Sequence, residues 1–223
     1  MRFSITARSV WVAALLVSAT GWAPAQAETN LNFVLGSKFL DSNDWPVGDS
    51  QGSLALLSTF GPSSWPVQVA IDVLGSGSAQ WTTDYSQSGV EIWEEDIIQS
   101  TFELDVGVRK IWGRRQARPF VGGGLAIIWG RQDRTLPFPP PPFDDGQDII
   151  TRPWVIVSAS DEAPGAWVDG GVFWRLGKRF NLGFEARISA AELTLSGRKV
   201  QAGGVSLGLI LGWGWGGGAR IVK

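Results

Sequence analysis

The chain has 223 residues, including 29 Gly, 13 Trp and 11 Phe, with no Cys, no His and a formal net charge of −2. A chain without His lacks the commonest general base and metal ligand, and a chain without Cys lacks disulfides, thiolate metal sites and iron–sulfur clusters. This composition argues against a hydrolase, a metalloenzyme or a redox protein. We therefore expect no catalytic residue, no cofactor and no bound metal, in a chain of one domain's length.

Residues 1–27 have the parts of a cleaved secretory signal peptide. Arg2 and Arg8 are basic, residues 10–17 (VWVAALLV) are apolar, and Ala25-Gln26-Ala27, before Glu28, has the small-x-small form of a signal-peptidase site. A retained membrane anchor needs about 20 apolar residues, and this run is shorter. Cleavage would remove two arginines and take the formal charge from −2 to −4, which gives no basic surface for nucleic acid.

Beyond the signal peptide the hydrophobic period is two, which predicts β-strands. Residues 100–112 show it best, because Phe102, Val106 and Val108 alternate with Glu103 and Asp105. The same alternation covers residues 67–73, 180–188 and 205–215, and weaker copies cover 31–40, 52–60, 120–130 and 166–176. The length of these segments is close to the ~10 residues of a tilted membrane-spanning strand. We predict an all-β fold over residues 28–215, a closed antiparallel up-and-down transmembrane barrel of about eight strands, followed by a short periplasmic tail at 216–223.

Alternation alone does not say which face of each strand lies inside. A soluble barrel of lipocalin type buries the apolar face, whereas an outer-membrane barrel turns it toward lipid. The connections favour the membrane barrel, because long and short ones alternate along the chain. Residues 41–51, 75–99, 131–165 and 194–201 would form long extracellular loops, and residues 61–66, 113–118 and 177–179 would form short periplasmic turns. A register slip at a bulge is an open alternative in 52–60, where Leu54, Leu56 and Leu57 break strict alternation.

The tryptophans fall near the predicted strand ends, as in the two interfacial belts of a membrane barrel. The alternative is that they are scattered core residues. On the short-turn side the predicted belt contains Trp65, Trp112, Trp174, Trp213 and Trp215. On the long-loop side it contains Trp45, Trp81, Trp93, Trp129 and Trp167.

Three segments resemble a known family. Residues 118–125 (RPFVGGGL), residues 181–189 (NLGFEARIS) and the Gly-rich last strand look like the small eight-stranded outer-membrane proteins of the OmpA-like and OmpX-like group. The resemblance covers nearly the whole mature chain. One feature departs from it, because such barrels usually end on an aromatic residue, whereas eight residues follow Trp215 here.

The polar faces of the strands carry charges of both signs. The lumen of eight strands is only wide enough for side chains, and charges held there must be paired. We predict a structural salt-bridge network that plugs the lumen, and the resemblance to OmpA-like barrels implies the same. Its predicted members are Glu103, Asp105, Arg109, Asp169, Arg175, Glu185 and Arg187. The alternatives are a narrow polar pathway and a carboxylate pair acting as acid and base.

The long loops would carry any specificity. The proline run at 137–142 would be a polyproline II segment, either a stiff spacer or a docking site for an unknown extracellular partner of the 131–165 loop. The other expected partners are outer-membrane lipid, lipopolysaccharide and the outer-membrane assembly machinery, and no nucleic acid is expected.

These observations predict a protein of the cell outer membrane with a structural and surface-anchoring role. The alternative is a narrow pore for small or apolar solutes, as in barrels that resemble the OmpW group. A barrel enzyme is disfavoured, because the enzyme families that share this architecture look to a His for catalysis.

Overall fold

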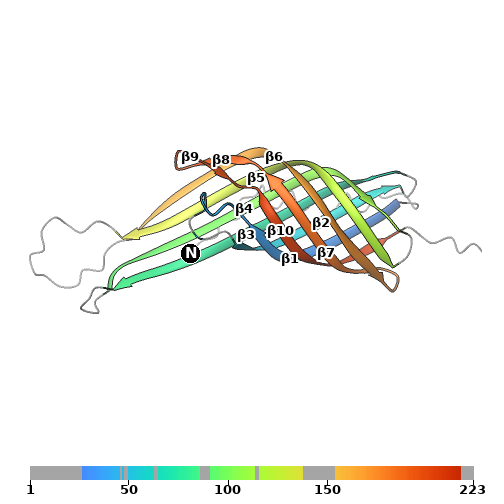
Figure 1. The fold of residues 1–223 in the computed structure, drawn as a ribbon, viewed down its shortest axis with the longest axis horizontal. Helices are drawn as coiled ribbons and strands as arrows, with labels where there is room; N and C mark the ends of the chain where they lie inside the picture. Colours follow the sequence, from blue (N-terminus) through green and yellow to red (C-terminus); the bar gives the residue numbers. More distant parts are fainter. Residues whose placement is uncertain are drawn as a thin grey trace, which may run out of the picture.

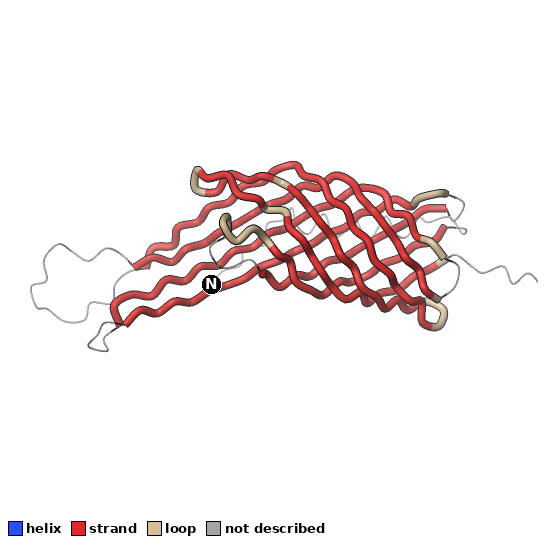
Figure 2. The backbone as a smooth tube through the Cα atoms, viewed as in Figure 1, coloured by secondary structure: helices blue, strands red, loops and turns tan. Residues whose placement is uncertain are grey.

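The computed structural model describes residues 27–45, 47, 50–62, 65–85, 91–113, 116–137 and 154–216, and there every regular element is a β-strand (Figures 1 and 2). The predicted signal peptide, except Ala27, and most of the predicted tail lie outside these ranges. Across the described ranges, no helix is both long enough and apolar enough to cross a membrane. The strands are β1 (Ala27–Phe39), β2 (Ser50–Pro62), β3 (Gln68–Tyr85), β4 (Glu91–Ile111), β5 (Ala117–Pro137), β6 (Trp154–Leu176), β7 (Phe180–Ala190), β8 (Glu192–Leu195), β9 (Arg198–Gln201) and β10 (Gly204–Trp215).

Eight of the strands close into an antiparallel barrel in the order β1-β10-β7-β6-β5-β4-β3-β2. Each barrel strand pairs with its neighbours along the chain, and β10 pairs with both β7 and β1 to close the cylinder. The turn between β6 and β7 is short because Gly177 takes a positive φ of 62°. The predicted all-β, closed antiparallel barrel of about eight strands is confirmed.

In several barrel strands polar side chains alternate with apolar ones, and there the polar side chains point inward. In β4, Glu103 and Asp105 are fully buried, whereas Phe102, Val106 and Val108 are 40%, 51% and 50% exposed. The register of β2 with both of its neighbours is continuous through residues 52–60, so no bulge is present there. The break in alternation has a simpler cause: Leu57 points into the lumen and is 1% exposed.

Four strands are longer than the sequence analysis predicted. β3, β4, β5 and β6 continue beyond the barrel as a protruding sheet (Figure 1), with pairs that reach Asp84 and Trp93, and Pro137 and Trp154. Much of the predicted loops 75–99 and 131–165 is therefore strand, because each hairpin continues its pairing beyond the closed barrel. In the 41–51 range, β2 already begins at Ser50.

The predicted 194–201 loop is also mostly strand. β8 and β9 form a small hairpin of their own between β7 and β10. Its turn is Ser196-Gly197, with φ values of 51° and 77°, and two residues of positive φ suit the twist of a tight hairpin.

Glycine on the inner face lets the strands approach closely. Gly107 and Gly124 face each other across β4 and β5. A Cβ on either would run into the backbone of the opposite strand. The narrow interior thus explains part of the high glycine content.

Candidate functional site

Arg187 lies at the centre of a buried charge cluster in the lumen. This arginine is 1% exposed and comes from the inward face of β7. Its guanidinium pairs with Asp72 at 2.5 Å, with Glu185 at 3.1 Å and, more closely, with Asp105. Asp169 lies 3.5 Å from the same group. One cation from β7 thus joins carboxylates of β3, β4, β6 and β7 across the barrel.

Arg109, from β4, is the second cation of the cluster. It donates to Asp72 at 2.6 Å and forms a close pair with Asp169. Arg109 and Arg187 therefore share these two carboxylates. Their guanidinium carbons lie 5.5 and 4.8 Å from the ring of Trp167, which is within the range of cation–π attraction.

Lys38, from β1, forms a separate ion pair nearby. Its Nζ donates to Glu103 at 2.5 Å, to the Thr101 hydroxyl at 2.9 Å and to the Ala202 carbonyl oxygen at 2.8 Å. The hydroxyl of Ser189 donates to the same Glu103 oxygen at 3.0 Å. The ammonium is fully buried and fully engaged, as a buried charge must be to offset its desolvation.

Arg175 lies apart from the cluster around Arg187 and Arg109. It belongs to a group near the short turns, where it donates to Glu28 at 3.2 Å, to Asn181 at 3.1 Å and to Asn30. Arg118 also pairs with Glu28. The structure places Arg109, Asp169, Asp105, Glu185 and Arg187 in one cluster. It places Glu103 on Lys38, not on an arginine.

The sequence analysis missed four charged members of these networks: Asp72, Lys38, Glu28 and Arg118. Asp72 had a usable signal, since it is the one charged residue on the polar side of the alternation in 67–73. Lys38 lies in a weakly alternating segment. Glu28 directly follows the predicted cleavage site, so no alternation marks its face.

Apolar side chains are also buried inside the barrel, in two clusters. One joins Leu57, Phe120 and Phe173 with Val34, Ala55, Leu74 and Ile210. The other lies under the β8–β9 hairpin and contains Trp45, Leu193, Val200, Ile128 and Trp167. Trp45 Nε1 donates to the Gln201 carbonyl oxygen at 2.7 Å, which ties the segment after β1 to β9. This second cluster forms a cap on the loop side.

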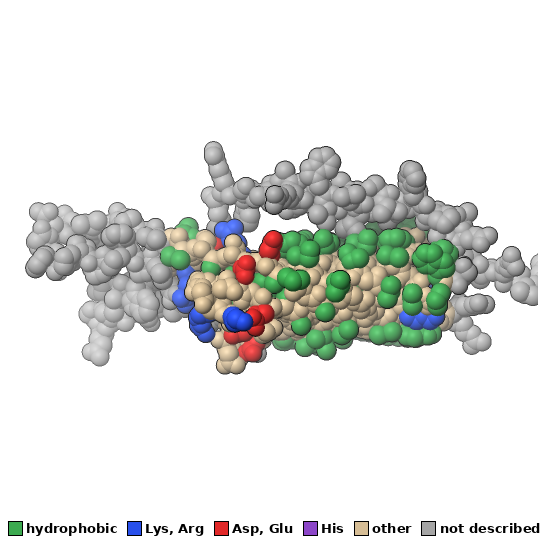
Figure 3. Space-filling view, turned by 90° about the horizontal axis from the view of Figure 1, so that it is seen from above, with side chains coloured by type: hydrophobic (Ala, Val, Ile, Leu, Met, Phe, Trp, Pro, Cys, Tyr) green, Lys and Arg blue, Asp and Glu red, His purple; other side chains and the backbone are tan. Residues whose placement is uncertain are grey.

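The outer surface of the barrel is an apolar band. Figure 3 shows hydrophobic side chains along the barrel, with charged side chains gathered toward the ends of the band. Large apolar residues lie open on it, Leu125 at 75% and Phe184 at 56% exposed. Near the short turns the predicted belt residues are exposed, with Trp65 at 55%, Trp112 at 46%, Trp174 at 36%, Trp213 at 45% and Trp215 at 40%.

The predicted loop-side belt is partly wrong. Trp45 and Trp167 are each 1% exposed, because Trp45 lies beneath the β8–β9 hairpin and Trp167 is on the inward face of β6. Trp129 is on the outer wall, where its Nε1 donates to Glu162. Trp81 and Trp93 belong to β3 and β4, and their side chains lie outside the described part of the structure.

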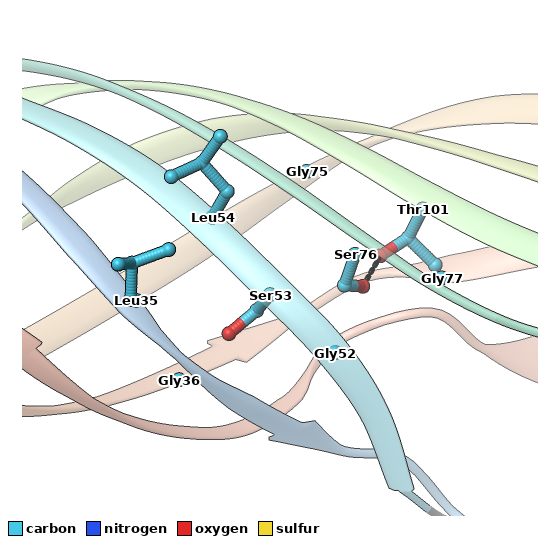
Figure 4. A pocket seen from close by; sticks show the side chains of 9 residues that line it. All are labelled: Leu35, Gly36, Gly52, Ser53, Leu54, Gly75, Ser76, Gly77 and Thr101. Atoms are coloured by element: carbon cyan, nitrogen blue, oxygen red, sulfur yellow. Dashed lines mark hydrogen bonds between the residues drawn. The ribbon is translucent and has the colours of Figure 1, made fainter.

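A shallow hollow of about 700 Å³ lies in the wall formed by β1 to β4 (Figure 4). Its lining contains Gly52, Gly75 and Gly77, bordered by Leu35 and Leu54, which are each 54% exposed. A Cβ on Gly75 would meet nothing within 4 Å. None of the residues that line the hollow is charged. The hollow is a dent in the apolar wall left by small residues.

Fold and surface together define a closed eight-stranded barrel with buried ion pairs in its lumen and an apolar exterior. No family model and no curated protein matches the sequence. The solved structures that resemble it include three outer-membrane proteins. The outer membrane protein OprG from Pseudomonas aeruginosa is 9% identical over 87% of this chain and 98% of that chain, with a TM-score of 0.47. The attachment invasion locus protein Ail of Yersinia pestis is 11% identical over 85% and 99%, with a TM-score of 0.43. A major outer membrane protein from Thermus thermophilus is 15% identical over 85% and 98%, with a TM-score of 0.42. At these scores the similarities identify no family, and the fold rests on the strand pairings of this chain.

Proposed function

We propose that the protein is an integral outer-membrane barrel that anchors its loops at the cell surface. The observation that carries this proposal is the inverted alternation, with charged residues buried in the lumen and Val, Leu, Ile and Phe turned outward. Soluble monomers rarely expose continuous apolar patches above a few hundred Å². In a bilayer the same band is matched by lipid, and barrel closure leaves no unpaired strand edge in hydrocarbon.

A soluble barrel of lipocalin type fits this arrangement poorly. Such a barrel keeps its apolar face inside. Here Asp72, Glu103 and Asp105 are fully buried inside, while Leu125 and Phe184 face out. In water, the apolar side chains of the outer wall would be exposed to solvent with nothing to bury them. The expected signal peptide at residues 1–27 supports export, and export of a barrel supports the outer membrane of a Gram-negative cell.

Cell fractionation with a heat-modifiability gel tests the location. The chain should be found with outer membranes, and an unheated sample should run as a fast, SDS-resistant form that slows after boiling. Recovery of the mature chain from the soluble periplasm, or a single mobility with and without boiling, would refute the proposal.

Within this role we propose that the lumen is plugged. Its ion pairs and the two apolar clusters support this, because a passing solute would have to separate several buried charges. The competing function is a narrow pore. Planar-bilayer recording decides between them: a plugged barrel gives no single-channel steps, and reproducible steps from the purified protein would favour the pore.

The expected partners remain part of this proposal: outer-membrane lipid, lipopolysaccharide, the assembly machinery and an extracellular partner of the 131–165 loop. The protruding sheet of β3 to β6 supports a role for that loop, because it holds the hairpin of β5 and β6 away from the barrel (Figure 1). No enzymatic activity is part of the proposal.

A further inference from the structure

A pocket of about 610 Å³ lies on the outer wall of β4, β5 and β6. Its lining includes two aromatic residues, Phe102 and Trp129, and the polar residues Ser100, Arg131, Ser160 and Glu162. It sits where the apolar band of the barrel meets the protruding sheet. The pocket is therefore amphipathic, and its size is in the range of small-molecule sites.

The aromatic side of the pocket is held in place. The rings of Phe102 and Trp129 are 5.4 Å apart and tilted by 50°. The Trp129 Nε1 donates to the carboxylate of Glu162, which fixes the orientation of the indole. Phe102 remains 40% exposed. A ring face fixed at the edge of an apolar wall is a suitable surface for the apolar face of a sugar.

The polar side of the pocket offers both donors and acceptors. The Arg131 Nε donates to the two oxygens of Asp133 at 2.9 and 3.1 Å. Among the described residues no protein group engages its two terminal nitrogens. Hydroxyls of Ser100 and Ser160 and the carboxylate of Glu162 complete the set, and these groups match the hydroxyls of a sugar.

The charges around the pocket disfavour an anion. Among the residues that line the pocket, Arg131 is the one cation, against the carboxylates of Asp161 and Glu162, and Asp133 pairs with Arg131 from outside the lining. The lining together with Asp133 therefore carries two negative charges in excess, so a phosphate would meet a net repulsive field. A neutral, hydroxyl-rich group would meet no such repulsion.

We propose that this pocket binds the sugar headgroup of an outer-leaflet glycolipid. The inference rests on the proposed membrane location, which puts the pocket at headgroup level with its aromatic side continuous with the lipid-facing wall. The sugar stacks on Trp129, its hydroxyls hydrogen-bond to Arg131 and Glu162, and its acyl chains follow the apolar band beside Phe102.

Native mass spectrometry of the full chain in phosphatidylcholine nanodiscs tests the site. The probes are lipid A, dephosphorylated lipid A and phosphatidylglycerol. The site variants are Trp129→Leu and Arg131→Gln. The controls are Trp174→Leu, from the aromatic pair with Phe184 at the other end of the band, and Arg198→Gln, on the exposed hairpin.

Both forms of lipid A should bind the wild type and the controls. Each site variant should lower the affinity for both forms by about tenfold, because one charge-assisted hydrogen bond or ring contact is lost. Equal binding to variants and wild type, or binding that requires the phosphates or is matched by phosphatidylglycerol, overturns the sugar site. Heat modifiability of every variant shows whether that variant folds. If the membrane proposal itself is wrong, the wild type will not enter the nanodisc, which distinguishes that failure from failure of the sugar site.

Discussion

Replacing Arg187 by Met should remove the centre of the lumenal charge cluster while keeping much of the side-chain volume. Asp72 and Asp169 would retain Arg109 as a partner. Asp105 and Glu185 would lose their partner, because Arg187 is the ion-pair partner that the structure gives each of them. The substitution therefore strands two buried carboxylates.

The expected loss of folding free energy follows from these two stranded carboxylates. Breaking a buried ion pair by removing one partner costs about 3–5 kcal/mol, because the remaining charge is left uncompensated. We expect the free energy of unfolding to fall by at least that amount. Arg198→Ala, at an exposed site on β9, should change it by no more than about 0.5 kcal/mol.

Neutralising the stranded groups should recover stability. Asp105→Asn and Glu185→Gln, added to Arg187→Met, remove the uncompensated charges and leave polar groups of the same shape. The triple variant should therefore be more stable than Arg187→Met alone. Equilibrium unfolding in guanidinium from lipid vesicles, followed by tryptophan fluorescence, measures each difference. A loss below about 1 kcal/mol for Arg187→Met, or no recovery in the triple variant, would refute the structural role of the network.

Three further predictions test the outer wall, the inner wall and the cap. Leu125→Arg should destabilise the membrane-inserted barrel by about 2–4 kcal/mol at mid-bilayer depth, while Ser158→Arg, on the exposed extension, should have little effect. A gel assay of the folded fraction in vesicles measures both, and equal folding would argue against a lipid-facing wall. Gly107→Ala should cost about 1–3 kcal/mol, because its Cβ meets the backbone of the next strand. Gly75→Ala, with open space around its Cβ, should be nearly neutral in the same unfolding assay. Trp45→Ala should cost about 3–5 kcal/mol, because the ring is 1% exposed, and a loss below about 1 kcal/mol would mean that the cap contributes little.

The strands could be predicted from the sequence because a period of two survives wherever one face is charged and the other apolar. Residues 100–112 and 180–188 show this, and both form barrel strands with the predicted polar face inside. The lengths of the strands could not be predicted in the same way. In 75–99 and 131–165 the pairing of each hairpin continues beyond the closed barrel, and pairing depends on the partner strand.

The burial of Trp167 could have been read from the sequence. Trp167 has the same parity in β6 as Asp169 and Arg175, both of which were assigned to the lumen. Its position near a strand end suggested a belt, but parity decides the face, and the structure buries it against two arginines. Trp45 is different. It follows β1 in a loop without periodicity, and its burial depends on the β8–β9 hairpin, which comes much later in the chain.

The cap and the charge cluster should depend on each other. Trp167 belongs to the capping cluster and also stacks on Arg187. Burial strengthens an ion pair because it lowers the local dielectric, and water admitted at the cap would weaken the pair and solvate any stranded carboxylate. Arg187→Met should therefore cost less in a Trp45→Ala background than alone. A double-mutant cycle measured by guanidinium unfolding should give a coupling energy of about 0.5–3 kcal/mol. Strict additivity would mean that the cap and the cluster stabilise the lumen independently.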